Sequence, residues 1–216
     1  VVTGRNSDRL QKTLNKLNGS GNIFSCFDLT NLEDVPAWTK QLAVANGGFS
    51  GIVHCAGIQL TMPTRGMSVS SFNDVLKTNL STAFVLAKGF RQKKVNNNGG
   101  SIVYLSSVMS VVGQQAVSAY CASKSALVGL CKSQALELAR ENIRVNCISP
   151  GHVSTEMADQ LKQTLTQSQF DSIRAAHPLG LGHVDDVAAA VAFLLADTGR
   201  WITGSNLLVD GGYTAQ

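Results

Sequence analysis

Short apolar segments alternate with longer stretches of helical periodicity along the whole chain. Several of the apolar segments contain almost no polar residue, which is typical of strands buried on both faces of a parallel sheet. They predict six strands, at Val1–Thr3, Asn22–Phe27, Gly51–His54, Ser101–Leu105, Ile143–Ile148 and Asn206–Val209.

The stretches between these strands repeat apolar residues at helical spacing. Leu10, Leu14 and Leu17 lie at i, i+4 and i+7, which indicates an amphipathic helix. Further helices are expected at Leu32–Ala45, Ser71–Arg91, Tyr120–Arg140 and Val184–Leu195. Alternating strands and helices predict an α/β fold with a doubly wound, Rossmann-like parallel sheet in three layers.

The chain reads as one domain over residues 1–216, because no repeat, linker or low-complexity tract divides it. A more polar and less regular stretch runs from Thr155 to Gly182, where a mobile lid over a substrate could form. No apolar run reaches the length of a membrane span, and no basic segment followed by an apolar one predicts a secretory signal.

Composition narrows the functional classes. Of the 216 residues, 44% are hydrophobic and 15% charged, which suits a well-buried core rather than disorder. The net charge of +4 comes from scattered Lys and Arg residues, whereas nucleic-acid binding needs clustered charge. Five widely spaced cysteines predict reduced, buried thiols in a cytoplasmic protein; they are Cys26, Cys55, Cys121, Cys131 and Cys147.

Tyr120 and Lys124 form the strongest chemical signal. Four residues apart in a predicted helix, they share one face. A lysine ammonium beside a phenol favours phenolate and would lower the pKa of the tyrosine from about 10 toward neutrality. Tyr120 would then be a usable proton donor or acceptor, although a solvated helix pair would show the same spacing.

Two further residues, Ser107 and Asn79, are candidates for the same site as this pair. Ser107 follows the strand Ser101–Leu105, at the sheet edge where ligands of α/β folds bind, and its hydroxyl could donate to a substrate oxygen. Ser106 is the competing assignment. Asn79 interrupts an apolar helix period, and would either face solvent, bond locally or serve the site.

In order and spacing, these landmarks resemble the classical short-chain dehydrogenase/reductase family, and in particular 3-oxoacyl-carrier-protein reductases. The resemblance runs from Val1 to the C-terminus. It rests on Asp28-Leu29, His54-Cys55-Ala56-Gly57, Asn79, Ser107, Tyr120 with Lys124, Pro150-Gly151, Ile202-Thr203-Gly204 and Val209-Asp210-Gly211-Gly212.

The resemblance implies a role for each matching residue. Tyr120 would be the general acid for carbonyl reduction, Ser107 would orient the carbonyl oxygen, and Lys124 would hold the nicotinamide ribose and tune Tyr120. Asn79 would support a water-linked proton relay to Lys124. The implied cofactor site comprises Arg5, Asp28 near the adenine, Leu29, His54, Ala56, Gly57, Tyr120, Lys124, Pro150 and Gly151, with Val153 and Thr155 near the nicotinamide carboxamide.

Two departures from the family pattern stand out. The family usually has Asn-Asn-Ala-Gly where this chain has His54-Cys55-Ala56-Gly57, so His54 would replace the first Asn as a hydrogen-bonding side chain. The other histidines, His152, His177 and His183, have no ligand spacing and are expected in loops; His152 could line the site. No metal site is expected.

The second departure is the absence of the family's glycine-rich loop between its first strand and first helix. Val1–Gly4 leads directly into a capped helix at Ser7–Leu10, which resembles the end of the family's second strand. Losing a central strand of ~5 residues would cost several kcal/mol at about 1 kcal/mol per hydrogen bond, against a total stability of ~5–15 kcal/mol. We therefore expect roughly 30–40 further residues upstream, unless two segments have been joined after Gly4.

Arg5 indicates which dinucleotide would bind. A carboxylate at the end of the second strand grips the ribose 2′-hydroxyl of NAD, whereas an arginine pairs with the 2′-phosphate of NADP. Thr3-Gly4-Arg5-Asn6 offers a guanidinium and no carboxylate, so NADP(H) is expected, although Arg5 could also be a solvated turn residue.

The sequence thus predicts an NADP(H)-dependent oxidoreductase acting on a carbonyl or alcohol, with a 3-oxoacyl thioester or another ketone as substrate. One alternative is a catalytically silent Rossmann-like binding or scaffold protein; a serine hydrolase would need the Gly-x-Ser-x-Gly elbow, which Ser107 lacks. Members of the resembled family are commonly homotetramers, with contact surfaces expected on Ser71–Arg91, Ala119–Arg140 and Leu207–Val209. No nucleic-acid or membrane partner is expected.

Overall fold

All six expected strands are present, with ends shifted by up to five residues. The computed structural model describes residues 1–155, 158 and 165–215. The strands are β1 Val2–Gly4, β2 Phe24–Cys26, β3 Phe49–His54, β4 Asn96–Leu105, β5 Ile143–Pro150 and β6 Asn206–Val209. The helices are α1 Ser7–Leu14, α2 Val35–Ala45, α3 Val69–Leu76, α4 Thr82–Phe90, α5 Ser118–Leu138, α7 Gln167–Ala175 and α8 Val184–Leu195.

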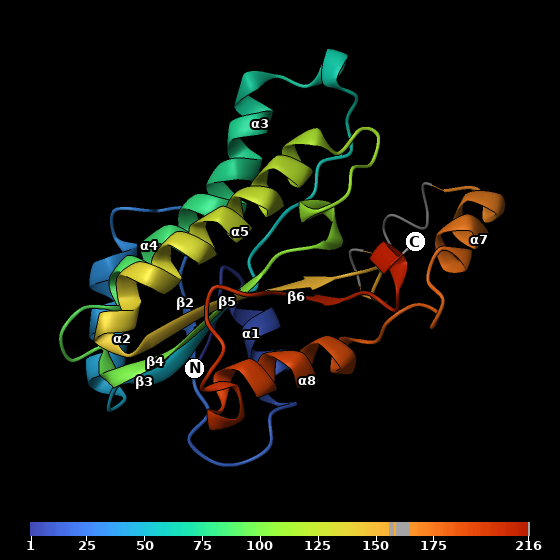
Figure 1. Cartoon of the computed structure of the whole chain (residues 1–216). Helices are drawn as coiled ribbons and strands as arrows, with labels where there is room; N and C mark the ends of the chain where they lie inside the picture. The colour runs from blue at the N-terminus through green and yellow to red at the C-terminus, as the bar shows by residue number, and fades with distance from the viewer. Residues whose placement is uncertain (156–157, 159–164, 216) are drawn as a thin grey trace.

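Helices cover both faces of the sheet, as the alternating pattern predicts (Figure 1). On one face, α4 and α5 pack against the sheet around Phe90, Tyr104 and Leu127, all fully buried. On the other face, α8 packs Leu194 against Val103 and Ile148. Adjacent strand residues point to opposite faces, so β4 contributes to both cores.

The strands form two parallel groups rather than one continuous sheet. β3, β4, β5 and β6 pair in that order, while β1 pairs with β2 alone, as Val2 with Phe24 through Gly4 with Cys26. Within residues 1–155, 158 and 165–215, no strand pairing joins β1 to β3. Residues of β3 are only partly buried until His54, whereas β4 and β5 are largely buried. The break lies where the missing first strand was expected.

The predicted helix Ser71–Arg91 is continuous but not uniform. It begins at α3, capped by the Ser68 hydroxyl, which accepts from the Ser71 N–H. It then passes through one π-helical turn, Lys77–Ser81, before continuing as α4. Such turns widen the helix by one residue and are frequent at functional sites; here the turn carries Asn79.

Arg144 on β5 attaches α8 to the sheet. Its guanidinium donates to the carbonyl oxygens of Leu194 at 2.6 Å, Gly199 at 3.0 Å, Leu195 at 3.2 Å and Ala196 at 3.3 Å. The last carbonyls of a helix have no partner within the helix. One cationic side chain therefore satisfies the end of α8 and the turn after it.

The expected polar stretch Thr155–Gly182 is described only in part, since residues 156–157 and 159–164 lie outside the described residues. Its second half contains α7, which begins with a capping box between Thr166 and Gln169.

The prediction of five buried cysteines was wrong for three of them. Cys131 and Cys147 are buried, whereas Cys26 and Cys55 are exposed and Cys121 is partly exposed; all five are free thiols.

Candidate functional site

The expected site residues gather at the carboxyl ends of β3, β4 and β5. Because these strands are parallel neighbours, the segments that follow them emerge at one edge of the sheet. Gly57 follows β3, Ser107 follows β4 and Gly151 follows β5. The first turns of α5 bring Tyr120 and Lys124 to the same edge.

Tyr120 and Ser107 lie within hydrogen-bonding reach of each other. Burial raises the pKa of the Tyr120 phenol above its usual 10, and the hydrogen bond with the Ser107 side chain opposes this only in part. The prediction that the pKa of Tyr120 is lowered toward neutrality is therefore wrong for the cofactor-free protein, because loss of hydration on burial raises this pKa. The phenol is protonated at neutral pH.

Lys124 is buried beside the tyrosine ring. Its Nζ lies 5.5 Å from the centre of the Tyr120 ring and donates to the Leu105 carbonyl oxygen at 2.6 Å. Burial lowers the pKa of Lys124 to about 8. The i, i+4 prediction is confirmed in geometry, since both residues face the edge of the sheet rather than solvent.

The structure separates the two competing serines. The Ser106 hydroxyl donates to the Lys124 carbonyl oxygen at 2.9 Å and is buried against α5. The Ser107 oxygen accepts from the Met109 N–H at 3.2 Å, which leaves its own proton free for the Tyr120 side. Ser107 is therefore the serine that can face a ligand.

Asn79 is fully buried, and its side chain bonds to residues far away along the chain. The alternative predictions, a solvent-facing or a locally bonded side chain, are therefore wrong. Its Oδ1 accepts from the Ile58 N–H at 2.8 Å. Its Nδ2 donates to the Ile58 carbonyl at 3.0 Å and to the Ser123 hydroxyl at 2.9 Å. The Asn79 side chain thus ties the segment after β3 to α5, one residue from Lys124.

Gly57 leaves an open surface above these groups. A Cβ added there would lie 3.5 Å from Asn79 Oδ1 and 3.5 Å from Lys124 Nζ. A side chain at this position would contact both polar atoms, so glycine keeps space beside Lys124 and the half-buried Ala56, while Asn79 stays fully buried. This cradle, with donors from Lys124, Tyr120 and Ser107, fits the hydroxyl-rich ribose of a dinucleotide.

His54 ends β3 and is buried, with its Nε2 2.7 Å from the Thr82 hydroxyl oxygen. Burial, with a smaller contribution from the Lys124 charge, lowers the pKa of His54 to about 3. The ring is neutral at any physiological pH. The His54 side chain is therefore a hydrogen-bonding group, which joins the end of β3 to the neighbouring helix at Thr82.

A second cluster lies at the carboxyl ends of β1 and β2. Arg5 is exposed just after β1, and Asp28 and Leu29 are half-buried after β2. Hydrogen bonds from the Thr30 N–H and hydroxyl, at 2.9 and 2.8 Å, lower the pKa of Asp28, and the Arg5 charge adds a smaller effect. The Asp28 carboxylate thus stabilises its own turn, while the Arg5 guanidinium faces solvent.

Gly151 serves packing within the protein. A Cβ there would lie 2.9 Å from the Asp210 Cα and 3.0 Å from His177 Nε2, closer than side chains pack. Contact with the C-terminal segment and His177 therefore already requires a glycine at this position. Pro150 ends β5, Val153 pairs with Gly182, and the Thr155 hydroxyl oxygen accepts from the Ala158 N–H at 3.2 Å.

His177 is a structural residue of this region that sequence reasoning missed. Its Nδ1 donates to the Ile173 carbonyl at 2.7 Å and its Nε2 accepts from the His152 N–H at 3.1 Å. Its ring stacks on Tyr213, with ring centres 4.8 Å apart. As expected, His177 lies in a loop, but its side chain is buried. No spacing in the sequence predicts these contacts.

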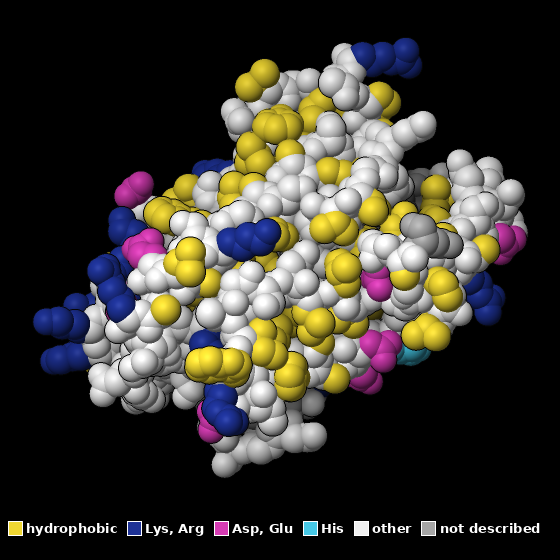
Figure 2. Space-filling model, in the orientation of Figure 1, with side chains coloured by type: hydrophobic (Ala, Val, Ile, Leu, Met, Phe, Trp, Pro, Cys, Tyr) yellow, Lys and Arg dark blue, Asp and Glu magenta, His cyan; other side chains and the backbone are white. Residues whose placement is uncertain are grey.

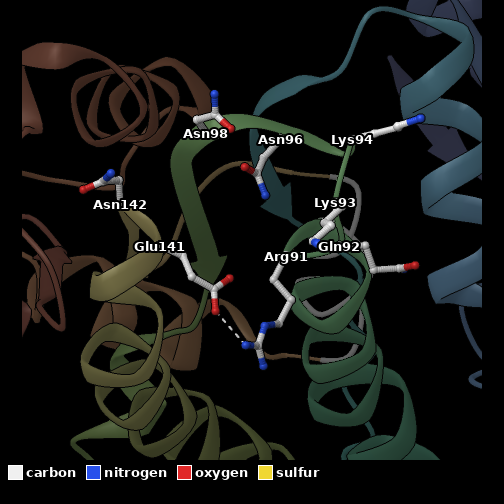
Figure 3. Close-up of a pocket in the computed structure, with 8 residues that line it drawn as sticks. All are labelled: Arg91, Gln92, Lys93, Lys94, Asn96, Asn98, Glu141 and Asn142. Atoms are coloured by element: carbon white, nitrogen blue, oxygen red, sulfur yellow. Dashed lines mark hydrogen bonds and ion pairs between the residues drawn. The ribbon is translucent and has the colours of Figure 1, made fainter.

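A separate hollow of about 440 Å³ lies at the opposite, amino-terminal end of β4 (Figure 3). Arg91 there pairs with Glu137 at 3.1 Å and Glu141 at 2.6 Å. Both α4 and α5 end nearby, so basic side chains complement the negative ends of these helices. The hollow is lined by Arg91, Gln92, Lys93, Lys94, Asn96, Asn98, Glu141 and Asn142.

Two negative findings apply to the described part of the chain. It contains no group of three or more His, Cys, Asp or Glu side chains placed to hold a metal ion. Nor does any of its helices have the length and hydropathy needed to cross a membrane.

A doubly wound sheet with a serine, a tyrosine and a lysine at its carboxyl edge defines an oxidoreductase of the dinucleotide-binding α/β class. Residues 1–214 match the family model described as enoyl-(acyl carrier protein) reductase. The chain belongs to the short-chain dehydrogenase/reductase family. This assignment makes it an NAD(P)-dependent oxidoreductase rather than a silent scaffold or a serine hydrolase.

Individual relatives agree with the family assignment. The chain is 32% identical over 213 residues to the 3-oxoacyl-(acyl-carrier-protein) reductase FabG of Rickettsia prowazekii, covering 98% of this chain and 85% of that protein. It is 33% identical over 215 residues to the acetoacetyl-CoA reductase of an Acinetobacter species, with the same coverage. The structure of ElxO with NADP bound superposes with a TM-score of 0.88 at 27% identity, covering 99% of this chain and 88% of that one.

Proposed function

We propose that this protein reduces the keto group of a 3-oxoacyl thioester with NADPH. The observation that carries the proposal is the shared location of Ser107, Tyr120 and Lys124 at one edge of the sheet. The substrate class is supported by the two relatives, whose names both describe reduction of a 3-oxoacyl thioester.

The side chains divide the work of carbonyl reduction between them. When bound, the reduced nicotinamide supplies the hydride that reaches the carbonyl carbon. The Ser107 hydroxyl donates a hydrogen bond to the carbonyl oxygen and stabilises the negative charge that grows there. Tyr120, whose raised pKa keeps its phenol protonated, transfers its proton to the same oxygen as general acid.

Lys124 and Asn79 support this transfer. Lys124 Nζ has two hydrogens beyond the one given to Leu105, and these would bind the hydroxyls of the nicotinamide ribose. Its positive charge would then favour the phenolate that Tyr120 becomes after giving up its proton. Asn79, which lies buried beneath Gly57, would support the water-linked relay that returns a proton to Lys124.

The remaining residues would hold the dinucleotide. Arg5, exposed and without a competing carboxylate on its own turn, would pair with the 2′-phosphate of NADPH. Asp28 and Leu29 would border the adenine, and Ala56 and Gly57 would form the cofactor side of the cradle, with the buried His54 behind them. The nicotinamide end would be bordered by Pro150, Gly151, Val153 and Thr155.

We also propose that a further parallel strand completes the sheet between β1 and β3 in the functional protein. Among the described residues β1 pairs with β2 alone and β3 with β4 alone, and the break separates Arg5 from the Lys124 side of the site. Buried backbone groups without partners cost about 1–3 kcal/mol each. A protein with the intact mass of 22.8 kDa that binds NADPH by itself would overturn this inference.

Oxidation of NADPH tests the reaction. With acetoacetyl-CoA or a β-keto ester, the full-length protein should consume NADPH, and Tyr120→Phe should lower kcat by about 10²–10⁴-fold while still binding NADPH. Tyr213→Phe is the matched control, because it keeps the ring that stacks on His177. Turnover that survives in Tyr120→Phe would refute the proposed role of the phenol.

A homotetramer is the assembly that the exposed apolar surfaces support. One groove, of about 680 Å³, runs across α4 and α5 and includes Phe84 and Leu130. Further exposed apolar side chains are Leu207 and Leu208 on β6 and Trp201, which is 97% exposed, in the segment before β6. Apolar side chains lie at several places on the visible surface (Figure 2). Two separate self-complementary surfaces generate a tetramer with three two-fold axes.

Light scattering tests the assembly. The wild type should have the mass of four chains, and Phe84→Glu should leave a dimer joined through the β6 surface. A monomeric wild type at micromolar concentration would refute the tetramer.

The cytoplasm is the compartment we propose, since five thiols remain free in the structure and a reducing compartment preserves them.

A further inference from the structure

The hydrogen bond between His54 and Thr82 has a defined direction. The Thr82 hydroxyl lies 2.5 Å from the Thr78 carbonyl oxygen and 2.7 Å from His54 Nε2. A carbonyl only accepts, so the single proton of Thr82 goes to Thr78. His54 must therefore carry its proton on Nε2 and donate it to Thr82.

This arrangement leaves the other ring nitrogen without a partner. His54 is 1% exposed, and its Nδ1 has no hydrogen-bond partner among the described residues. Since the ring is neutral, Nδ1 is an acceptor buried without a donor, which is unfavourable. The hydrogen bond that His54 makes in the protein is therefore the one from its Nε2–H to Thr82.

The Thr82 hydroxyl replaces a backbone hydrogen bond of the helix. In an α-helix, the Thr78 carbonyl would accept from the N–H of residue 82. In the π-helical turn, the Thr82 N–H bonds instead to the Lys77 carbonyl. The hydroxyl then bonds to the Thr78 carbonyl, and His54 fixes the orientation of that hydroxyl. The π-helical turn is thereby joined to the end of β3.

The same turn carries Asn79. The orientation of the turn decides whether the Asn79 amide reaches Ile58 on one side and Ser123 on the other. Ser123 in turn donates to the Tyr120 carbonyl oxygen at 2.8 Å. A continuous set of hydrogen bonds thus runs from His54 through Thr82 and the turn to the backbone of Tyr120.

We propose that His54 is a positioning residue, which through Thr82 sets the π-helical turn and so aims Asn79 at the cofactor cradle and α5. The inference deepens the proposed reductase function and rests on it. His54 neither touches the reacting atoms nor exchanges a proton. It acts by fixing where Asn79 and the first turn of α5 lie.

Paired variants test the role. In His54→Gln the amide nitrogen can occupy the position of Nε2, whereas in His54→Asn it ends near Nδ1 and cannot reach Thr82. We expect His54→Asn and Thr82→Val each to lower kcat by about tenfold, since small misplacements of reacting groups can cost ~100-fold. The double variant should be no slower than either single variant, and His54→Gln and Thr82→Ser should restore most of kcat.

Two readouts separate positioning from stability and from the reductase proposal. The positioning role would be overturned if His54→Asn lowered only the melting temperature and left kcat, measured per molecule of bound NADPH, at the wild-type value. Side-chain amide signals in NMR spectra give a test without turnover: those of Asn79 should shift in His54→Asn and return in His54→Gln. Unchanged Asn79 signals would overturn the inference, whereas a wild type without turnover would overturn only the proposed function.

Discussion

Replacing Lys124 with methionine should make the protein more stable and inactive at once. Lys124 is 5% exposed, and its Nζ donates a hydrogen bond to the Leu105 carbonyl oxygen. Methionine has an unbranched side chain of similar length and fills such a site without a charge. The substitution therefore removes a buried ammonium while keeping most of the packing.

The size of the effect follows from the pKa of Lys124. Burial lowers this pKa from 10.5 to about 8, which at 1.36 kcal/mol per tenfold change in the protonation equilibrium corresponds to ~3 kcal/mol of unfavourable charge burial at neutral pH. Leaving the Leu105 carbonyl without its donor costs about 1 kcal/mol. We expect Lys124→Met to raise the free energy of unfolding by ~2 kcal/mol.

The pH dependence gives the sharper assay. Between pH 8 and 10.5 the unfolded wild type binds a proton at Lys124 that the folded protein has lost, so wild-type stability rises with pH across this window. Below about pH 8 both states are protonated and the full penalty applies. The advantage of Lys124→Met should thus be largest at neutral pH and shrink by ~2–3 kcal/mol by about pH 10.

Urea unfolding of the cofactor-free protein measures the difference between wild type and variant at each pH. Titration of groups that do not sense the Lys124 charge cancels in this difference, and Cys55, whose pKa that charge lowers, contributes a smaller change. A variant that is less stable than the wild type at neutral pH would refute the reasoning. So would a stability difference that does not change between neutral pH and about pH 10.

Three further predictions concern single residues. Arg144→Ala should destabilise the protein by ~2–3 kcal/mol in urea unfolding, since four carbonyls at the end of α8 lose a charged donor, whereas the exposed Arg140→Ala should change stability by less than about 0.5 kcal/mol. Arg5→Ala should weaken binding of NADPH at least about tenfold more than that of NADH in fluorescence titrations, with Arg9→Ala on α1 as the control; equal losses would refute the 2′-phosphate contact. Gly151→Ala should lower the melting temperature, with a cost of ~1–3 kcal/mol, because its Cβ would meet the Asp210 backbone at 2.9 Å; an unchanged melting temperature would contradict the contact.

The sequence alone determined the elements, their order and the pairing of the reactive side chains. Strand and helix periods are local properties, so apolar runs and i, i+4 repeats were enough to place six strands and the long helices. The four-residue spacing of Tyr120 and Lys124 fixed their common face for the same reason. The order of the landmarks brought Ser107 to the carboxyl edge of the sheet, because parallel topology follows from the alternation of strands and helices.

Tertiary structure decided what depends on burial and on distant partners. No local pattern shows that Asn79 reaches Ile58 and Ser123, that the helix widens by a π-helical turn to allow it, or that His177 holds the loop after β5. The direction of the Tyr120 pKa shift also depends on the packed site, because burial of the phenol raises this pKa more than the hydrogen bond with Ser107 lowers it. Sequence spacing specifies which groups can meet along one element, whereas dielectric environment and long-range hydrogen bonds are set by what the other elements place around them.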